Sequence, residues 1–122
     1  MLKLTLDKKD AIATLEPQGA LEKKDFDDAV KIIDPYIEEY GKLNGVIINT
    51  ESFPGYDDFA AMSRHFTFVK NHHKKIKRLA FVTDSVVGDI AEKFTGHFIQ
   101  AEVKTFPYGQ LEKAKEWILE VA

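Results

Sequence analysis

Alternation between hydrophobic and polar positions divides this chain into strands and helices. Short apolar or alternating segments have the pattern of β-strands at residues 2–6, 11–15, 45–49, 78–83 and 101–106. Apolar residues that recur at i, i+3 and i+4 predict helices over residues 23–40, 57–72, 85–98 and 109–122. Only a polar turn separates the first two strands, so we expect them to form an antiparallel hairpin.

The first predicted helix has features that bear on its continuity and its end. Pro35 lies inside it, and because proline removes one backbone hydrogen bond, we expect the helix to kink or split near Asp34. Gly41 follows the last apolar position and is expected to end the helix. The face expected to enter the core carries Phe26, Ala29, Val30, Ile33, Ile37 and Tyr40.

The order of these elements predicts the fold class. Strands that alternate with helices favour a mostly parallel sheet with right-handed crossovers. We therefore predict an α/β fold, with a five-stranded mixed, mostly parallel sheet, an antiparallel edge strand and about four helices. At 122 residues, the chain fits one domain over residues 1–122.

Composition narrows the classes of function. A net charge of −3, without a basic stripe that alternates with aromatic residues, argues against a nucleic-acid partner. The absence of cysteine excludes disulfides and thiol catalysis, and it fits a reducing cytoplasm. The first residues contain no apolar signal segment, and no run approaches the ~20 apolar residues of a membrane span. We expect a cytoplasmic protein whose contact with the inner face of the membrane, if it has one, is peripheral.

Residues 45–58 carry the strongest functional signal. A short apolar strand ends there in a loop with aromatic residues, and ligands of open α/β sheets bind at the carboxyl ends of the strands. Helix N-termini expected on the same side attract anionic groups. We predict a pocket for an apolar or amphipathic small molecule with an anionic head, lined by Phe53, Tyr56, Phe59, Val87, Ile90, Phe94, Phe106 and Tyr108. The alternative is a loop folded back so that Phe53 and Tyr56 cap the core.

A second predicted surface combines an aromatic residue with basic residues. Phe68 falls on the polar side of its helix, and the basic segment 70–78 follows. Peripheral proteins meet anionic lipid in this way, so we predict membrane contact at Phe68, Lys70, Lys74, Lys75, Lys77 and Arg78. Single exposed apolar residues are common, and cations are favoured at helix C-termini, so a solvated helix end is the alternative.

No arrangement of residues indicates an enzyme or a metal site. His72 and His73 are adjacent, so on a helix they point about 100° apart, and no third ligand is evident. His65 and His97 lie on separate predicted helices and form no recognisable triad with a serine. We therefore expect no catalytic residue, no metal and no cofactor.

Three sequence features together resemble a known family. They are the apolar central strand, the Phe-Pro-Gly-Tyr loop at residues 53–56 and the closing Glu-Lys-Ala-Lys-Glu-Trp-Ile segment at residues 112–118. In this combination the chain resembles the bacterial SpoIIAA-like family, which is related to STAS domains and more distantly to CRAL-TRIO lipid-transfer domains. The resemblance implies a five-stranded mixed sheet and a binding function, either for a regulatory partner or for a lipid.

The resemblance also implies a candidate phosphorylation residue. STAS regulators are phosphorylated at a motif that reads roughly Asp-Ser-Ser-Gly after the central strand. Here Ser52 follows Glu51, and Phe53 stands in place of a second serine, so the motif is incomplete. Our first hypothesis is a non-enzymatic module that binds a lipid-like ligand, with a peripheral membrane contact. The second is a STAS-type regulator that binds a protein through the 50–56 loop, where Ser52 is phosphorylated.

Overall fold

The computed structural model describes residues 2–18, 22–51, 76–84 and 102–120. Along the chain these residues form β1 (Leu2–Asp7), β2 (Ile12–Pro17), α1 (Lys23–Tyr40), β3 (Leu43–Asn49), β4 (Ile76–Val82), β5 (Glu102–Phe106) and α4 (Leu111–Leu119). All five predicted strands are present, each within two residues of its predicted bounds.

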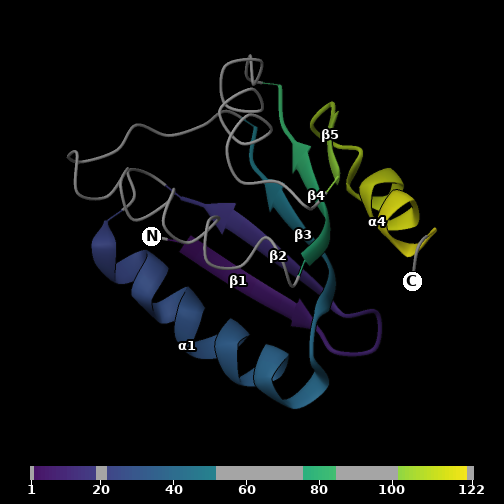
Figure 1. The fold of residues 1–122 in the computed structure, drawn as a ribbon. Helices are drawn as coiled ribbons and strands as arrows, with labels where there is room; N and C mark the ends of the chain where they lie inside the picture. The colour runs from purple at the N-terminus through teal and green to yellow at the C-terminus, as the bar shows by residue number, and fades with distance from the viewer. Residues whose placement is uncertain (1, 19–21, 52–75, 85–101, 121–122) are drawn as a thin grey trace.

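The strands form one mixed sheet in the order β1-β2-β3-β4-β5 (Figure 1). β1 pairs antiparallel with β2, whereas the other neighbouring strands pair parallel. This confirms the predicted five-stranded sheet with an antiparallel edge strand. The described residues contain two helices, α1 and α4, rather than about four. The helices predicted over 57–72 and 85–98 lie outside the described residues.

The β1–β2 connection explains why the first pair is antiparallel. The Asp7 carboxylate accepts the backbone N–H of Lys9 and that of Asp10, each at 3.0 Å. Ala11 then adopts a positive φ of 55° before β2 begins. A turn this short can join antiparallel strands only, because a parallel pair needs a crossover of a dozen or more residues.

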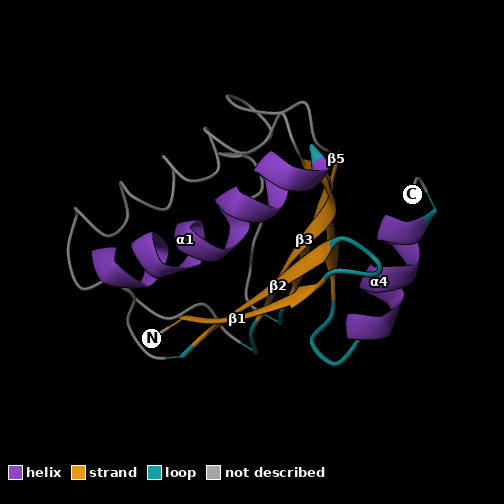
Figure 2. Cartoon of the chain, turned by 90° about the horizontal axis from the view of Figure 1, so that it is seen from below, coloured by secondary structure: helices purple, strands orange, loops and turns teal. Residues whose placement is uncertain are grey.

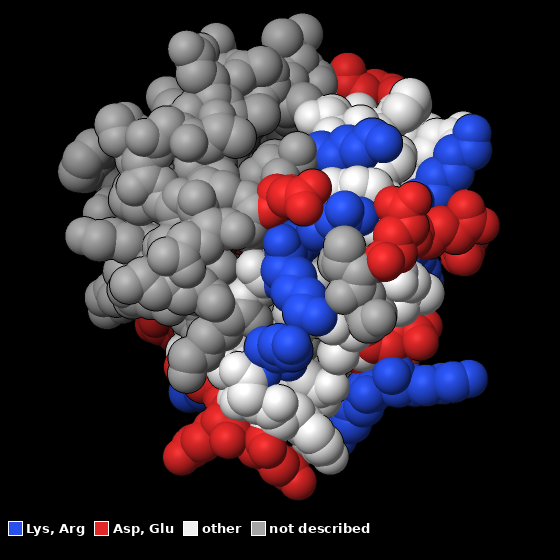
Figure 3. All heavy atoms as spheres, turned by 45° about the vertical axis from the view of Figure 1, so that its right-hand side comes forward, with Lys and Arg blue, Asp and Glu red and all other residues white. Residues whose placement is uncertain are grey.

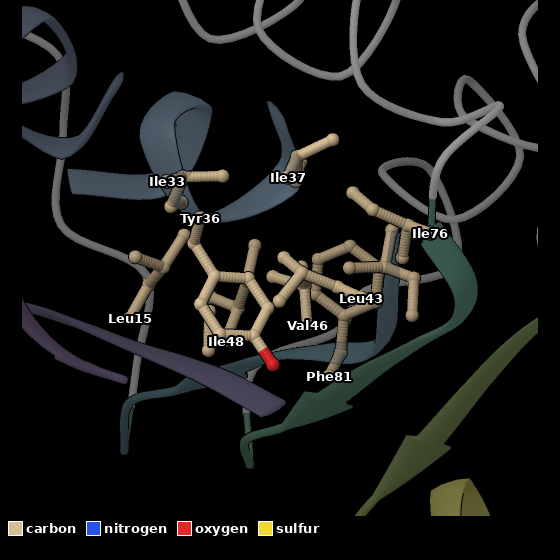
Figure 4. Close-up of a cluster of buried hydrophobic side chains, with 11 residues drawn as sticks. Leu15, Ile33, Tyr36, Ile37, Leu43, Val46, Ile48, Ile76 and Phe81 are labelled. Carbon is tan, nitrogen blue, oxygen red and sulfur yellow. The ribbon is translucent and has the colours of Figure 1, made fainter. Parts of the chain in front are cut away.

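The sheet lies between two helical layers (Figure 2). On one face, α1 packs over the larger core cluster, in which Figure 4 shows side chains of α1 meeting those of β2, β3 and β4. On the other face, α4 packs against β3, β4 and β5. That second cluster consists of Ile12, Ile47, Ala80, Val82, Phe106, Ala114 and Ile118.

α1 runs unbroken from Lys23 to Tyr40, so the predicted split near Asp34 is wrong. Pro35 and Lys31 are both exposed, so the carbonyl that loses its helical partner belongs to the solvent-facing side of the helix. Burial of Ile33 and Ile37 on either side of the proline holds the helix on the sheet. Packing of α1 on the sheet therefore outweighs the tendency of Pro35 to break the helix.

The C-terminal end of α1 is as predicted. Gly41 adopts a left-handed φ of 89°, and its N–H donates to the Ile37 carbonyl at 2.6 Å. The predicted core face is wrong at one position, because Tyr40 is 59% exposed and Tyr36 is buried instead. The Tyr36 hydroxyl donates to the Lys8 carbonyl at 3.4 Å, so its polar atom has a partner inside the fold.

Gly45 marks the closest approach of α4 to the sheet. A Cβ atom built at this position would lie 2.5 Å from the Ile118 Cδ1 atom. Any larger residue would collide with Ile118, which is fully buried. The absence of a side chain at Gly45 therefore sets the distance between α4 and β3.

Candidate functional site

The carboxyl edge of the parallel strands is the part of the described structure that best fits the predicted ligand site. Register places Asn49 of β3 opposite Val82 of β4, and Val82 opposite Phe106 of β5. The three strands therefore end at the same level. In open α/β sheets, ligands bind outside such an edge.

Backbone hydrogen bonds continue beyond the last strand residues. The Thr50 N–H donates to the Val82 carbonyl at 3.0 Å, and the Thr83 N–H donates to the Phe106 carbonyl at 2.9 Å. One residue further on, the Asp84 N–H donates to the Glu51 carbonyl at 3.0 Å. These bonds hold the three chain segments together where they leave the sheet.

Two side chains reinforce this edge. The Thr83 hydroxyl, in a residue only 3% exposed, donates to the Glu51 carbonyl at 3.2 Å. The Asp84 carboxylate accepts the Tyr108 N–H at 3.1 Å, which ties the end of β4 to the residues after β5. Sequence reasoning did not single out either side chain for this role. Both residues directly follow an apolar strand, and that position is the sequence feature from which this role could have been predicted.

A polar pair lies nearby on the face that carries α4. The Asn49 amide donates to the Glu16 carboxylate at 3.2 Å and so joins β3 to β2. Glu16, Glu51 and Asp84 bring three carboxylates to the described part of this edge, and the exposed Lys3 of β1 lies opposite Glu16. The anionic head of the ligand stays a prediction, because most of the predicted lining residues lie outside the described residues.

Two of the predicted ligand-binding residues are described, and they differ in environment. Phe106 is buried under α4, and its ring centroid lies 6.0 Å from that of Trp117. Tyr108 is 45% exposed at the carboxyl edge. The other predicted lining residues lie outside the described residues, as does Ser52; they are Phe53, Tyr56, Phe59, Val87, Ile90 and Phe94.

Arg78, predicted to contact a membrane, instead joins β4 to α4. Its guanidinium donates to the Trp117 carbonyl and to the Glu120 carboxylate, the latter at 3.1 Å. It also pairs with Glu102 at 3.5 Å, and its side chain is only 11% exposed. Figure 3 shows basic and acidic side chains close together on this side of the molecule. A guanidinium engaged in this way cannot also face lipid, so we remove Arg78 from the predicted contact surface.

Lys77 lies at the opposite, amino edge of the sheet. Its neighbour Ile76 pairs with Leu43, which brings Lys42 close to Lys77. A side-chain hydrogen bond with Lys42 lowers the pKa of Lys77, and burial and the positive charge of Lys42 lower it further. The other residues predicted for membrane contact lie outside the described residues; they are Phe68, Lys70, Lys74 and Lys75.

The described residues contain neither a metal site nor a membrane-spanning helix. No three His, Cys, Asp or Glu side chains gather there as a group that could hold a metal ion. His72 and His73 are not among these residues. Neither α1 nor α4 is both long enough and apolar enough to cross a membrane.

Comparison with known proteins places the chain in a family. Its fold resembles the crystal structure of an uncharacterized protein of the DUF3478 family, with a SpoIIAA-like fold, from Shewanella loihica PV-4. The TM-score is 0.66 at 17% sequence identity, over 97% of this chain and 92% of that chain. No curated protein matches. A sequence model of the SpoIIAA-like family matches residues 12–119, which is most of the chain. The chain therefore belongs to the SpoIIAA-like family.

Proposed function

We propose that this chain is a non-enzymatic module that binds an apolar or amphipathic small molecule at the carboxyl edge of its sheet. One observation carries the proposal: hydrogen bonds tie three strand ends together beside the exposed ring of Tyr108. Because hydrogen bonds already hold the backbone here, an exposed ring offers apolar contact area at a low entropic cost of binding.

The remaining predicted pocket residues fit this proposal by their place in the sequence. One group lies in the segment that begins after Glu51, and the other lies in the segment that begins after Asp84. Both segments therefore start at the strand ends that the hydrogen bonds hold together. The first group is Phe53, Tyr56 and Phe59, and the second is Val87, Ile90 and Phe94.

Native mass spectrometry of the purified chain tests this function. We expect a co-purifying mass in the range of a lipid-sized molecule, released on denaturation. Tyr108→Ala should retain less of it, whereas Tyr40→Ala, at a tyrosine 59% exposed at the other end of the sheet, should retain as much as wild type. Equal retention by both variants would place the ligand elsewhere.

The same function includes a peripheral contact with an anionic membrane through the amino edge. The proximity of Lys42 and Lys77 supports this contact. Two neighbouring ammonium groups repel each other, and an anionic phosphate between them stabilises both. Phe68, Lys70, Lys74 and Lys75 complete the proposed surface. Vesicles with phosphatidylserine should bind wild type at low salt and should bind Lys42→Glu/Lys77→Glu poorly. Lys113→Glu, at an exposed lysine of α4, is the matched control.

A regulatory protein-binding role is the second candidate function. Membership of the SpoIIAA-like family favours it, because the related STAS domains act as binding modules. In this role the partner binds the 50–56 loop and Ser52 is phosphorylated. Incubation with a cell extract and ATP should then add one phosphate-sized mass to wild type and none to Ser52→Ala. If wild type gains no mass, this regulatory role is excluded for Ser52.

A further inference from the structure

β1 forms one lateral edge of the sheet. It pairs with β2 on one side, and among the described residues no segment pairs with its other side. Figure 2 shows α1 and α4 as layers on the two faces of the sheet. In an edge strand, alternate residues direct their backbone N–H and C=O groups outward, where a further strand can bind them.

The side chains of β1 separate into two faces. Leu2, Leu4 and Leu6 are half-buried and pack against the core cluster under α1. Lys3 and Thr5 are exposed on the other face, and Asp7 is half-buried there. A strand added at this edge must have the same alternation to continue both faces.

A second copy of β1 meets this requirement. Antiparallel pairing of two identical strands keeps leucine against leucine only if the twofold axis passes through a residue. If the axis passes through Thr5, Leu4 faces Leu6 of the partner subunit, and Lys3 faces Asp7 of the partner subunit. The twofold axis repeats both pairs. If it passes through Leu4, Lys3 faces Thr5 of the partner subunit and no charges pair.

Charge therefore selects the register that is centred on Thr5. Opposite charges on directly paired residues stabilise antiparallel strands, and the two copies supply two such pairs. A lysine on an edge strand normally deters pairing, but in this register it meets a carboxylate. Asp7 is well placed for this contact, because its Oδ1 atom is fixed by the N–H groups of Lys9 and Asp10. Its Oδ2 atom takes part in neither bond.

An exposed apolar residue on α1 lies on the same side. Ile32 is 48% exposed and precedes Tyr36 by one helical turn, so both lie on one side of α1. The Tyr36 hydroxyl reaches the Lys8 carbonyl in the β1–β2 turn. This side of α1 therefore faces the β1 edge, where a second copy would cover Ile32.

We propose that two copies of this chain associate through antiparallel pairing of β1 about Thr5, which joins their sheets into one continuous sheet. The proposal does not rest on the ligand site, because it uses the lateral edge of the sheet, although Lys3 also lies opposite Glu16 of its own chain. The interface is small, so we expect an equilibrium between monomer and dimer that shifts with protein concentration.

Sedimentation velocity over a range of concentrations tests the proposal. The mass of wild type should rise from 13.9 kDa toward twice that value. Lys3→Glu and Asp7→Lys should each weaken self-association at least tenfold, because like charges then face each other. An equimolar mixture of these two variants should associate again, because one pair then joins the two substituted residues, of opposite charge, and the other joins the native Asp7 to the native Lys3. Lys113→Glu, the same charge change at an exposed residue of α4, should associate like wild type.

Three results overturn the proposal. They are a wild type that stays monomeric at its highest soluble concentration, a Lys3→Glu variant that associates like wild type, and a mixture that fails to associate. Asp7→Lys removes the side chain that holds the turn, so its thermal unfolding is measured first. If it is unfolded, Asp7→Asn replaces it, and this variant must weaken association less than Lys3→Glu because it removes attraction without adding repulsion.

Discussion

The Arg78 guanidinium lies 4.5 Å from the centroid of the Trp117 ring, and this contact joins the start of β4 to the last turn of α4. Arg78 also donates to the Trp117 carbonyl in the last turn of the helix, a carbonyl that accepts the Glu120 N–H as well, at 3.3 Å. A cation at this end is favoured by the helix dipole as well. One side chain thus stabilises α4 by stacking, hydrogen bonding and charge.

Replacement of Arg78 should therefore loosen α4. Arg78→Lys keeps the charge but loses the planar guanidinium and its stacking surface. We therefore expect the free energy of unfolding to fall by about 1–3 kcal/mol. Urea denaturation followed by Trp117 fluorescence measures it. Lys104→Ala is the control, because this exposed lysine lies farther from the Trp117 ring, at 6.0 Å. Equal stability of Arg78→Lys and wild type would contradict the role given to the guanidinium.

Gly45→Ala should destabilise the protein through a collision with Ile118. The added Cβ atom lies 2.5 Å from Ile118 Cδ1, so α4 must shift, at a cost of roughly 1–3 kcal/mol. Shortening Ile118 to valine removes Cδ1 and should relieve part of this cost. In a double-mutant cycle, Gly45→Ala/Ile118→Val should be more stable than the sum of the single changes predicts. Strict additivity would mean that α4 does not press on Gly45.

Tyr36 should make stability depend on alkaline pH. Burial raises its pKa above 10.0, and negative charge on Tyr40, Asp7 and Glu39 adds to the shift. Below pH ~10 both states hold the proton and the stabilisation is fully present. As pH rises through the raised pKa, the unfolded state has already lost its proton, so the stabilisation is lost. Tyr36→Phe should flatten this decline, which begins at about pH 10.

The matched control for that experiment is Tyr108→Phe, because Tyr108 is 45% exposed and is not among the groups that raise the pKa of Tyr36. Its stability should fall with pH as steeply as that of wild type. Thermal unfolding at a series of pH values compares the three proteins. An equally steep fall in Tyr36→Phe would mean that other groups cause the pH dependence.

Asp84→Ala should release the residues that follow β5. The variant loses the acceptor for the Tyr108 N–H, which should cost about 1 kcal/mol because the carboxylate is exposed. Hydrogen exchange at the Tyr108 amide should become faster, whereas Asp84→Asn keeps an acceptor oxygen and should remain close to wild type. Unchanged exchange in Asp84→Ala would show that the hydrogen bond does not hold Tyr108.

The sheet could be predicted from the sequence because its signals are local. Alternation in residues 2–6 and the apolar segments at 45–49 and 78–83 depend on neighbours within a few positions, and Gly41 ends α1 as its position predicts. Pro35 was misjudged because the packing that keeps α1 continuous comes from strands distant in the sequence. Tyr36 was missed for the same reason, since its partner Lys8 precedes it by 28 residues.

The candidate site was less predictable than the sheet. Arg78 belongs to a basic segment and has the sequence pattern of a surface residue, yet its partners Glu102 and Glu120 lie far along the chain. Asp84 directly follows an apolar strand, yet it accepts the Tyr108 N–H from beyond β5. Side chains that join separate elements depend on register, which no local pattern specifies. The position of the carboxyl edge follows from strand order alone, and for that reason it could be predicted.

The two ends of α4 are held in different ways: Leu111 and Ala114 pack the first turn on the second core cluster, without a side-chain cap. Ile118 against Gly45 and Arg78 on the last turn fix its C-terminal half, whereas the N-cap residue Gln110 makes no side-chain capping hydrogen bond. The uncapped first turn follows Tyr108 directly, so it begins at the candidate site. A molecule bound there can change the fraying of this turn without disturbing the buried core. A ligand at the proposed site would therefore act on the first turn of α4, while Gly45 and Arg78 hold its C-terminal half in place.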